Sequence, residues 1–158
     1  MPLFVHTGNA LDATDPVIAE GCNCLGAHGA GFARQISTRF PTAVASYKDA
    51  CKAGRLTPGR CILVQTSRSP LHYVAFLATQ HSYGRPRPGQ TPFAKPQWIS
   101  EAFKSLSDTC SALGLPSVAI PPIGAGLGGL DWATEVAPAI NQGIAESGLI
   151  VNAYFLQR

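Results

Sequence analysis

The sequence predicts an α/β fold in which a mixed sheet of about six strands is covered by helices on both faces. Short β-rich apolar runs alternate with stretches of helical periodicity along the chain. Apolar residues make up 46% of the 158 residues and charged residues only 13%, which is typical of a compact globular domain. Two glycine-rich stretches each stand between an expected strand and an expected helix, as the loops of α/β folds do.

The first half of the chain is expected to hold four strands and two helices. In chain order they are strands over 3–6 and 17–22, helices over 31–39 and 41–52, and strands over 61–65 and 73–78. Pro41 suits the first turn of the second helix, and Gly54 marks its end. Residues 67–70, Ser-Arg-Ser-Pro, indicate a hairpin turn between the last two strands. Because a hairpin pairs its strands antiparallel, the sheet is expected to be mixed.

The second half is expected to continue as helix, strand, helix and strand. Their ranges are 98–113, 117–120, 132–145 and 149–156. Gly114 ends the first of these helices, and Pro138 is expected to kink or shorten the second near its start. The proline-rich stretch 79–96 indicates a long loop of the kind that is usually functional or mobile. We expect one domain over residues 1–158, with no internal repeat or linker.

Charge and cysteine content argue against several classes of protein. The net charge is +3 and the basic residues are scattered along the chain, so a nucleic-acid partner is not expected and an anionic small ligand is equally compatible. The five cysteines form no C-x-x-C pair and no zinc-type spacing, so we expect reduced thiols, no metal and no cofactor. No signal peptide or membrane-spanning run is evident. We expect a cytoplasmic monomer.

The two glycine-rich stretches predict an anionic ligand. Residues 22–33 read C-N-C-L-G-A-H-G-A-G-F-A, and residues 121–132 read P-P-I-G-A-G-L-G-G-L-D-W. In each, backbone N–H groups near a helix N-terminus are available to a phosphate. The alternative is that the glycines only permit tight turns and close packing. Two such loops in one small chain favour a ligand with two anionic or ribosyl ends.

The second loop also matches the letters of the dinucleotide fingerprint G-x-G-x-x-G. That fingerprint belongs at the first strand of its fold, and here it stands near the C-terminus, which disfavours a dinucleotide oxidoreductase. A Walker A loop is excluded because no Lys-Ser or Lys-Thr follows the glycines.

These residues resemble the macrodomain family of ADP-ribose-binding modules over essentially the whole chain, which implies a three-layer α-β-α fold. The pattern C-N-C-x-G-x-x-G-x-G, with Arg39-Phe40-Pro41 and Tyr47 after it, is similar to one branch. That branch holds the yeast-type ADP-ribose-1''-phosphate phosphatase, the terminal ADP-ribose protein glycohydrolase and the DarG antitoxins. The resemblance implies that the partner is ADP-ribose or an ADP-ribosylated protein, and that a bond at C1'' of the distal ribose is hydrolysed.

The resemblance also implies the ligand-binding positions. They are Gly8, Asn9, Ala10, Asn23, Gly29, Ala30, Gly31, Phe32, Gln80, Ile123, Gly124, Ala125, Gly126, Leu127, Gly128 and Tyr154. The first three would meet the adenine, with Tyr154 either lying along its ring or serving as an ordinary core-edge tyrosine. The loop from Asn23 to Phe32 would hold the distal ribose. The loop from Ile123 to Gly128 would hold the diphosphate through its backbone N–H groups.

Three positions depart from the family pattern. Asn9 stands where many members have an aspartate that accepts a hydrogen bond from adenine, and its side-chain oxygen can still accept one. Gln80 stands where the glycohydrolase and DarG members have a lysine, and Gly128 stands where they often have an acid. Because Gln80 cannot form a covalent adduct with an opened sugar, the lysine-nucleophile mechanism is doubtful. A non-catalytic ADP-ribose reader is the alternative to a hydrolase.

The catalytic candidates are Asn23 and His28. Catalysis would rest on positioning and on a water oriented by the ligand's own phosphate, with Asn23 bonded to the ribose hydroxyls. His28 is of the residue type that can serve as an acid or base near neutral pH; the alternative is a packing or loop-surface histidine. His81 is expected to be an exposed loop residue, and Asp131 a helix N-cap.

Overall fold

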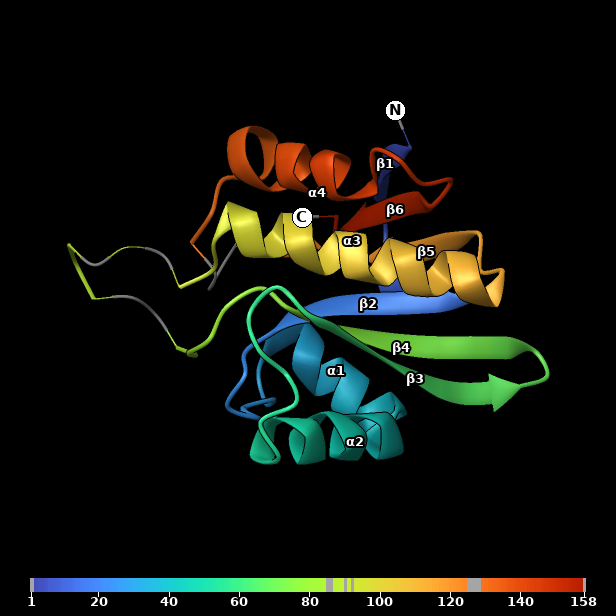
Figure 1. Ribbon diagram of the computed structural model, residues 1–158, viewed down its shortest axis with the longest axis horizontal. Helices are drawn as coiled ribbons and strands as arrows, with labels where there is room; N and C mark the ends of the chain where they lie inside the picture. The colour runs from blue at the N-terminus through green and yellow to red at the C-terminus, as the bar shows by residue number, and fades with distance from the viewer. Residues whose placement is uncertain (1, 85–86, 90, 92, 125–128, 158) are drawn as a thin grey trace.

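The computed structural model describes residues 2–84, 87–89, 91, 93–124 and 129–157. A six-stranded sheet, in the order β1-β6-β5-β2-β4-β3, lies between two layers of helices (Figure 1). Its strands are β1 (Leu3–Thr7), β2 (Val17–Cys22), β3 (Cys61–Arg68), β4 (Leu71–Ala78), β5 (Ser117–Ile120) and β6 (Ile150–Phe155). β3 pairs antiparallel with β4 and every other pairing is parallel, so the expected mixed sheet is confirmed.

Helices cover both faces of the sheet (Figure 1). They are α1 (Gly31–Arg39) and α2 (Pro41–Lys52) on one face, and α3 (Pro96–Leu113) and α4 (Ala137–Ile144) on the other. The bounds of β2, α1, α2 and β5 are those that the sequence predicts. The hairpin strands are longer than predicted, because their ladder continues past an irregularity between Gln65 and Ser67 to the turn at Ser69-Pro70.

Two local features differ from the sequence prediction. A 3₁₀ turn follows β1 over Ala10–Asp12, where the Asn9 side chain accepts a hydrogen bond from the Leu11 N–H at 3.0 Å. The expected helix over 132–145 starts as a π-helical turn, Trp132–Val136, before α4. Pro138 has no N–H to continue a regular ladder into that turn, which accounts for the altered start.

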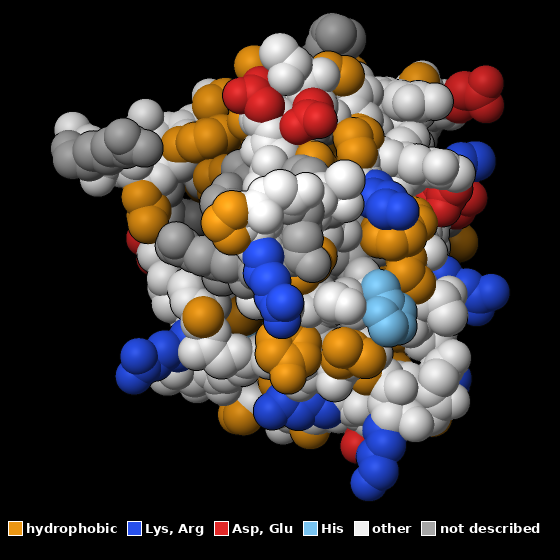
Figure 2. Space-filling model, turned by 90° about the vertical axis from the view of Figure 1, so that its left-hand side faces the viewer, with side chains coloured by type: hydrophobic (Ala, Val, Ile, Leu, Met, Phe, Trp, Pro, Cys, Tyr) orange, Lys and Arg blue, Asp and Glu red, His pale blue; other side chains and the backbone are white. Residues whose placement is uncertain are grey.

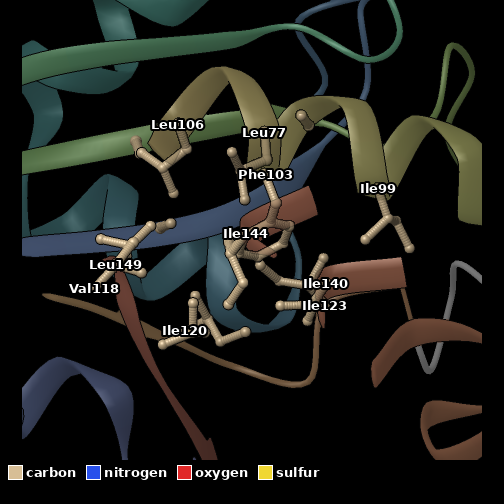
Figure 3. Packing of buried hydrophobic residues seen from close by; sticks show 14 of the residues in the cluster. Leu77, Ile99, Phe103, Leu106, Val118, Ile120, Ile123, Ile140, Ile144 and Leu149 are labelled. Atoms are coloured by element: carbon tan, nitrogen blue, oxygen red, sulfur yellow. The ribbon is translucent and has the colours of Figure 1, made fainter. Parts of the chain in front are cut away.

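The larger apolar core lies between the sheet and the α3–α4 layer. Figure 3 shows Phe103 from α3, Ile144 from α4 and Ile120 from β5 pointing into this space. The two helices approach closely at Gly143, where a Cβ would lie 2.5 Å from the carbonyl oxygen of Ser100. A smaller cluster lies beneath α1 and α2 and includes the buried ring of Tyr47. Among the residues described, no helix combines the length and apolar character that crossing a membrane requires.

The chain leaves the sheet in opposite directions after β2 and β5, which are parallel neighbours. β2 leads to α1 on one face, and β5 leads towards α4 on the other (Figure 1). Open α/β sheets bind ligands beyond the carboxyl ends of strands at such a switch point. We call this side of the sheet, where β1, β2, β4, β5 and β6 end, the carboxyl edge.

Candidate ligand-binding site

The residues singled out in the sequence come together at the carboxyl edge. Gly8, Asn9 and Ala10 follow β1, Asn23 to Phe32 follow β2, Gln80 follows β4, Ile123 and Gly124 follow β5, and Tyr154 is near the end of β6. Because these five strands are parallel, their ends lie on one side of the sheet. The positions assigned to the diphosphate at Ala125, Gly126, Leu127 and Gly128 lie outside the described residues.

Asn23 is buried and braces its own loop. Its Nδ2 donates to the carbonyl oxygen of Ala27 at 2.8 Å, and its Oδ1 accepts from the N–H groups of Leu25 and Ala27 at 3.0 and 3.2 Å. The hydroxyl of Tyr47 donates to the Asn23 carbonyl oxygen at 2.8 Å. Burial raises the pKa of Tyr47, so this hydroxyl stays protonated as a donor. The side chain assigned to the ribose therefore has its hydrogen bonds within the loop.

His28 points into the core beneath the same loop. Its side chain is 1% exposed, with Nε2 on the Glu20 carboxylate and Nδ1 2.7 Å from Ser37 Oγ. The ring also packs against Tyr47 and Phe76, with centroids 5.4 and 6.0 Å away. Both ring nitrogens are engaged below the loop. His28 is therefore placed as a packing histidine. It is not positioned to exchange a proton with a ligand at the carboxyl edge.

Glu20 and Ser37 are the residues that the sequence reasoning missed. Glu20 stands within β2 with its side chain 3% exposed, and burial is the largest cause that raises the pKa of its carboxyl, opposed by His28. The available signal was an acid inside the apolar run 17–22, since a buried acid needs a partner. Ser37 gives no such signal, because its position on α1 follows only from the folded chain.

The loop after β2 is open on the side that faces away from Glu20, His28 and Ser37. A Cβ placed on Gly29 or Gly31 would meet no atom within 4 Å. Gly31 starts α1 with a φ of +57°, whereas Gly29 does not have a positive φ. Ala30 makes no side-chain capping bond, so it leaves first-turn N–H groups of α1 to other acceptors. Phe32 packs against the smaller core cluster rather than over the loop.

The segment after β4 is joined to the Asn23 loop. The N–H of Cys24 donates to the carbonyl oxygen of His81 at 3.0 Å, and the Cys24 thiol lies 3.6 Å from that of Gln80. The Gln80 amide donates to the Ser82 carbonyl oxygen at 2.6 Å. Gln80 therefore lies beside the expected ribose position, and its amide supplies neither a nucleophile nor a base. His81 is exposed, as expected.

The loop after β5 is held by packing in its described part. The Ile123 side chain is buried in the larger core, and its N–H donates to the carbonyl oxygen of Pro121 at 2.7 Å. Gly124 has a φ of +78°, and its Cβ would lie 2.8 Å from Ile99 Cδ1. Asp131 is the N-cap expected, since it accepts from the Thr134 N–H at 2.9 Å and from its hydroxyl at 2.7 Å. These bonds lower the pKa of its carboxyl.

Gly8, Asn9, Ala10 and Tyr154 form the end of the edge assigned to adenine. A Cβ on Gly8 would lie 3.6 Å from Tyr154 Cδ1, and Tyr154 is half-buried with its ring stacked on His6 at 4.9 Å. The Asn9 amide donates to Gln35 Oε1 on α1 at 3.2 Å, in addition to its cap. Ala10 is buried, so it offers its backbone alone.

The cysteines of the site are poor nucleophiles. Burial raises the pKa of Cys22 well above its ordinary value and that of Cys24 to about 11, so both thiols stay protonated near neutral pH. All five cysteines are free thiols. In the part of the chain that the structure covers, no three His, Cys, Asp or Glu side chains are grouped to hold a metal ion.

Comparisons with known proteins agree with this fold. A family model described as "Macro domain" matches residues 19–140. A Mycobacterium tuberculosis protein named DNA ADP-ribosyl glycohydrolase is 33% identical over 128 residues, which cover 80% of this chain and 34% of that protein. The chain thus spans about a third of that relative. The ADP-ribose 1''-phosphate phosphatase of Meyerozyma guilliermondii is 25% identical over 179 residues, which cover 98% of this chain and 94% of that protein. The solved macrodomain of Mycobacterium tuberculosis DarG superposes with a TM-score of 0.83 at 27% identity, over 96% of each chain.

Proposed function

This chain belongs to the macrodomain family, and on that premise we propose that it binds ADP-ribose at the carboxyl edge and hydrolyses a bond at C1'' of the distal ribose. The observation that carries the proposal is the open space over Gly29. That residue has no positive φ, and a Cβ added to it would meet no atom within 4 Å, so packing and backbone conformation give no reason for a glycine. Close approach of a ligand to the backbone does give one.

The remaining parts of the edge suit the other groups of ADP-ribose. The N-terminus of α1 offers N–H groups and a partial positive charge to ribosyl or phosphate oxygens. Gly8 would offer its backbone to the adenine and Tyr154 the ring face that is not stacked on His6, and the loop after β5 would carry the diphosphate. The names of the two relatives reported above describe hydrolysis of ADP-ribose derivatives, which supports the same reaction class here.

The reaction rests on positioning. Among the described residues assigned to the site, Gln80 is an amide, His28 is buried on Glu20, and Asp131 caps a helix, so none of them is a free nucleophile or base. The loop would hold the distal ribose so that a water, oriented by the ligand's own phosphate, attacks C1'' while the bond from C1'' to the leaving group breaks and the leaving group takes up the proton that the water loses. Fixing both reactants in this way is a recognised source of rate acceleration.

The test offers three substrates and measures release of ADP-ribose. They are a glutamate-ADP-ribosylated protein, an ADP-ribosylated DNA oligonucleotide and ADP-ribose-1''-phosphate. Turnover of at least one is expected. Tight binding of ADP-ribose with no turnover of any of the three would overturn the hydrolase assignment.

A non-catalytic reader is the second candidate, and Gln80 in place of the family lysine favours it. Asn23→Ala separates the two, because a reader loses only affinity whereas an enzyme loses kcat beyond what binding explains. A melting curve of the variant must accompany the assay, since Asn23 also braces the loop.

A further inference from the structure

The two helical layers carry opposite charge. Residues 23–60, which include α1 and α2, hold six basic residues and one acidic residue. Residues 93–149, which include α3 and α4, hold two basic and five acidic residues. Figure 2, which faces the left-hand side of Figure 1, shows acidic side chains gathered near the top and most basic ones in the lower half. The net charge of +3 is therefore unevenly distributed. We call residues 23–60 the basic layer and residues 93–149 the acidic layer.

The cations of the basic layer face solvent without acidic partners. They are Arg34, Arg39, Lys48, Lys52, Arg55 and Arg60, and all six are exposed. The ion pairs found within the described part of the chain are Glu20–His28 and Lys104–Asp108, and neither involves these six cations. The positive charge is therefore available to an anionic partner.

A hollow on α1 lies within this layer, and its accessible surface is mostly that of side-chain carbons. It is lined by Arg34, Gln35, Thr38 and Arg39. The two guanidinium groups flank a side-chain amide and a hydroxyl along about one turn of helix. These residue types are the ones that contact phosphate and sugar in protein–nucleic acid complexes.

We propose that the basic layer binds the sugar–phosphate backbone of a nucleic-acid strand. An anionic membrane would also need exposed apolar side chains, and Leu25 is the only exposed large hydrophobic residue within 23–60. An acidic protein would need a buried aromatic or aliphatic anchor, which the hollow on α1 lacks. A regular polyanion needs neither of these features.

The layer is continuous with the carboxyl edge. A Cβ on Gly26, in the Asn23 loop, would lie 3.9 Å from Lys48 Cγ. At the other end, Gln35 of the hollow accepts from the Asn9 amide at 3.2 Å. A strand on the basic layer would thus pass beside the proposed ADP-ribose site. The inference does not depend on that function, because an unmodified strand is expected to bind.

The test measures fluorescence anisotropy of a labelled, unmodified single-stranded DNA oligonucleotide across a salt series. Arg34→Ser, Lys52→Ser and Arg55→Ser should each weaken binding, and each should reduce the slope of log K against log[salt] by about 0.7, the value for one phosphate contact on a single strand. Lys104→Ser removes the same charge from the acidic layer and should leave affinity and slope unchanged. The triple variant should lose oligonucleotide binding and keep its affinity for ADP-ribose.

Three results would overturn the proposal. The first is no salt-dependent binding of the oligonucleotide by the unaltered chain. The second is an equal loss in Lys104→Ser, which would mean a response to overall charge. The third is binding to phosphatidylserine vesicles or to polyglutamate through these residues while the oligonucleotide is ignored. If the unaltered chain binds the oligonucleotide but does not bind ADP-ribose, the proposed function fails and this inference stands.

Discussion

The two glycine-rich loops at the carboxyl edge are alike in sequence and held in different ways. The loop after β2 is braced from below by the side chains of Asn23 and His28, and its Gly29 faces open space. In the loop after β5, Gly124 packs so closely against Ile99 that a Cβ would lie 2.8 Å from its Cδ1. A glycine can thus mark the approach of a ligand in one loop and the approach of a helix in the other. Four experiments would break or sharpen this contrast.

Removing the carboxylate beneath the first loop should have the largest effect. Glu20→Ala leaves the buried His28 without its acidic partner, so we expect a loss of about 3 kcal/mol in the free energy of unfolding. Glu20→Gln is the matched control, because its amide oxygen still accepts a hydrogen bond from Nε2–H. Urea denaturation measures both. Equal stability of Glu20→Ala and the unaltered protein would show that the pair does not anchor the loop.

A methyl group added to each loop tests the contrast itself. Gly124→Ala should cost about 2 kcal/mol, because it forces a side chain into a positive φ and against the side chains of Ile99 and Val136. Gly29→Ala should change stability by no more than about 0.5 kcal/mol, as is usual for a surface substitution. Similar costs at both positions would erase the distinction drawn between the loops.

Tyr47→Phe tests how far the first loop depends on the core. The change removes the hydroxyl that donates to the Asn23 carbonyl oxygen at 2.8 Å, and a stability loss of about 1 kcal/mol is expected. Hydrogen exchange at the amides of Leu25 and Ala27 should accelerate, because Asn23 holds both. Unchanged exchange at these amides would indicate that Asn23 braces the loop without Tyr47.

Acidification should affect the two loops in opposite senses. The pKa of Glu20 is raised above its ordinary 4.5, so ionising this buried carboxyl costs stability: the gain from its protonated form is complete below pH 4.5 and is lost as pH rises through the raised pKa. The pKa of Asp131 is lowered below its ordinary 3.8, so its contribution holds above pH 3.8 and is lost as pH falls through the lowered pKa. On acidification the protein should gain stability relative to Glu20→Gln and lose it relative to Asp131→Asn. Parallel trends in urea denaturation would contradict both directions.

Local signals in the sequence predicted much of the fold. β2, α1, α2 and β5 have the expected bounds, since apolar runs, Pro41 at a helix start and glycines at turns act within a few residues. The extended hairpin depends on cross-strand hydrogen bonds that local patterns do not specify, whereas Pro138 indicates an irregular start of the last helix but not its π-helical form. The confirmed macrodomain resemblance rests on motifs that span the chain.

The site was harder to predict because side-chain direction is a tertiary property. The sequence identified the loop from Asn23 to Gly31, yet it could not show that the His28 ring turns inward to Glu20 and Ser37. Both partners lie in other elements of the fold. The excess of basic residues over 23–60 is visible in the sequence, but only the fold shows that α1 and α2 carry it on one face of the sheet.

The most direct test of the central claim is a calorimetric titration of ADP-ribose into the unaltered protein and Gly29→Val. Folding does not require a glycine at position 29, so Gly29→Val should have the same melting temperature as the unaltered protein. Its side chain would fill the space over the loop, so affinity should fall at least about tenfold, or about 1.4 kcal/mol. Equal affinity in two equally stable proteins would show that the distal ribose does not lie over this loop.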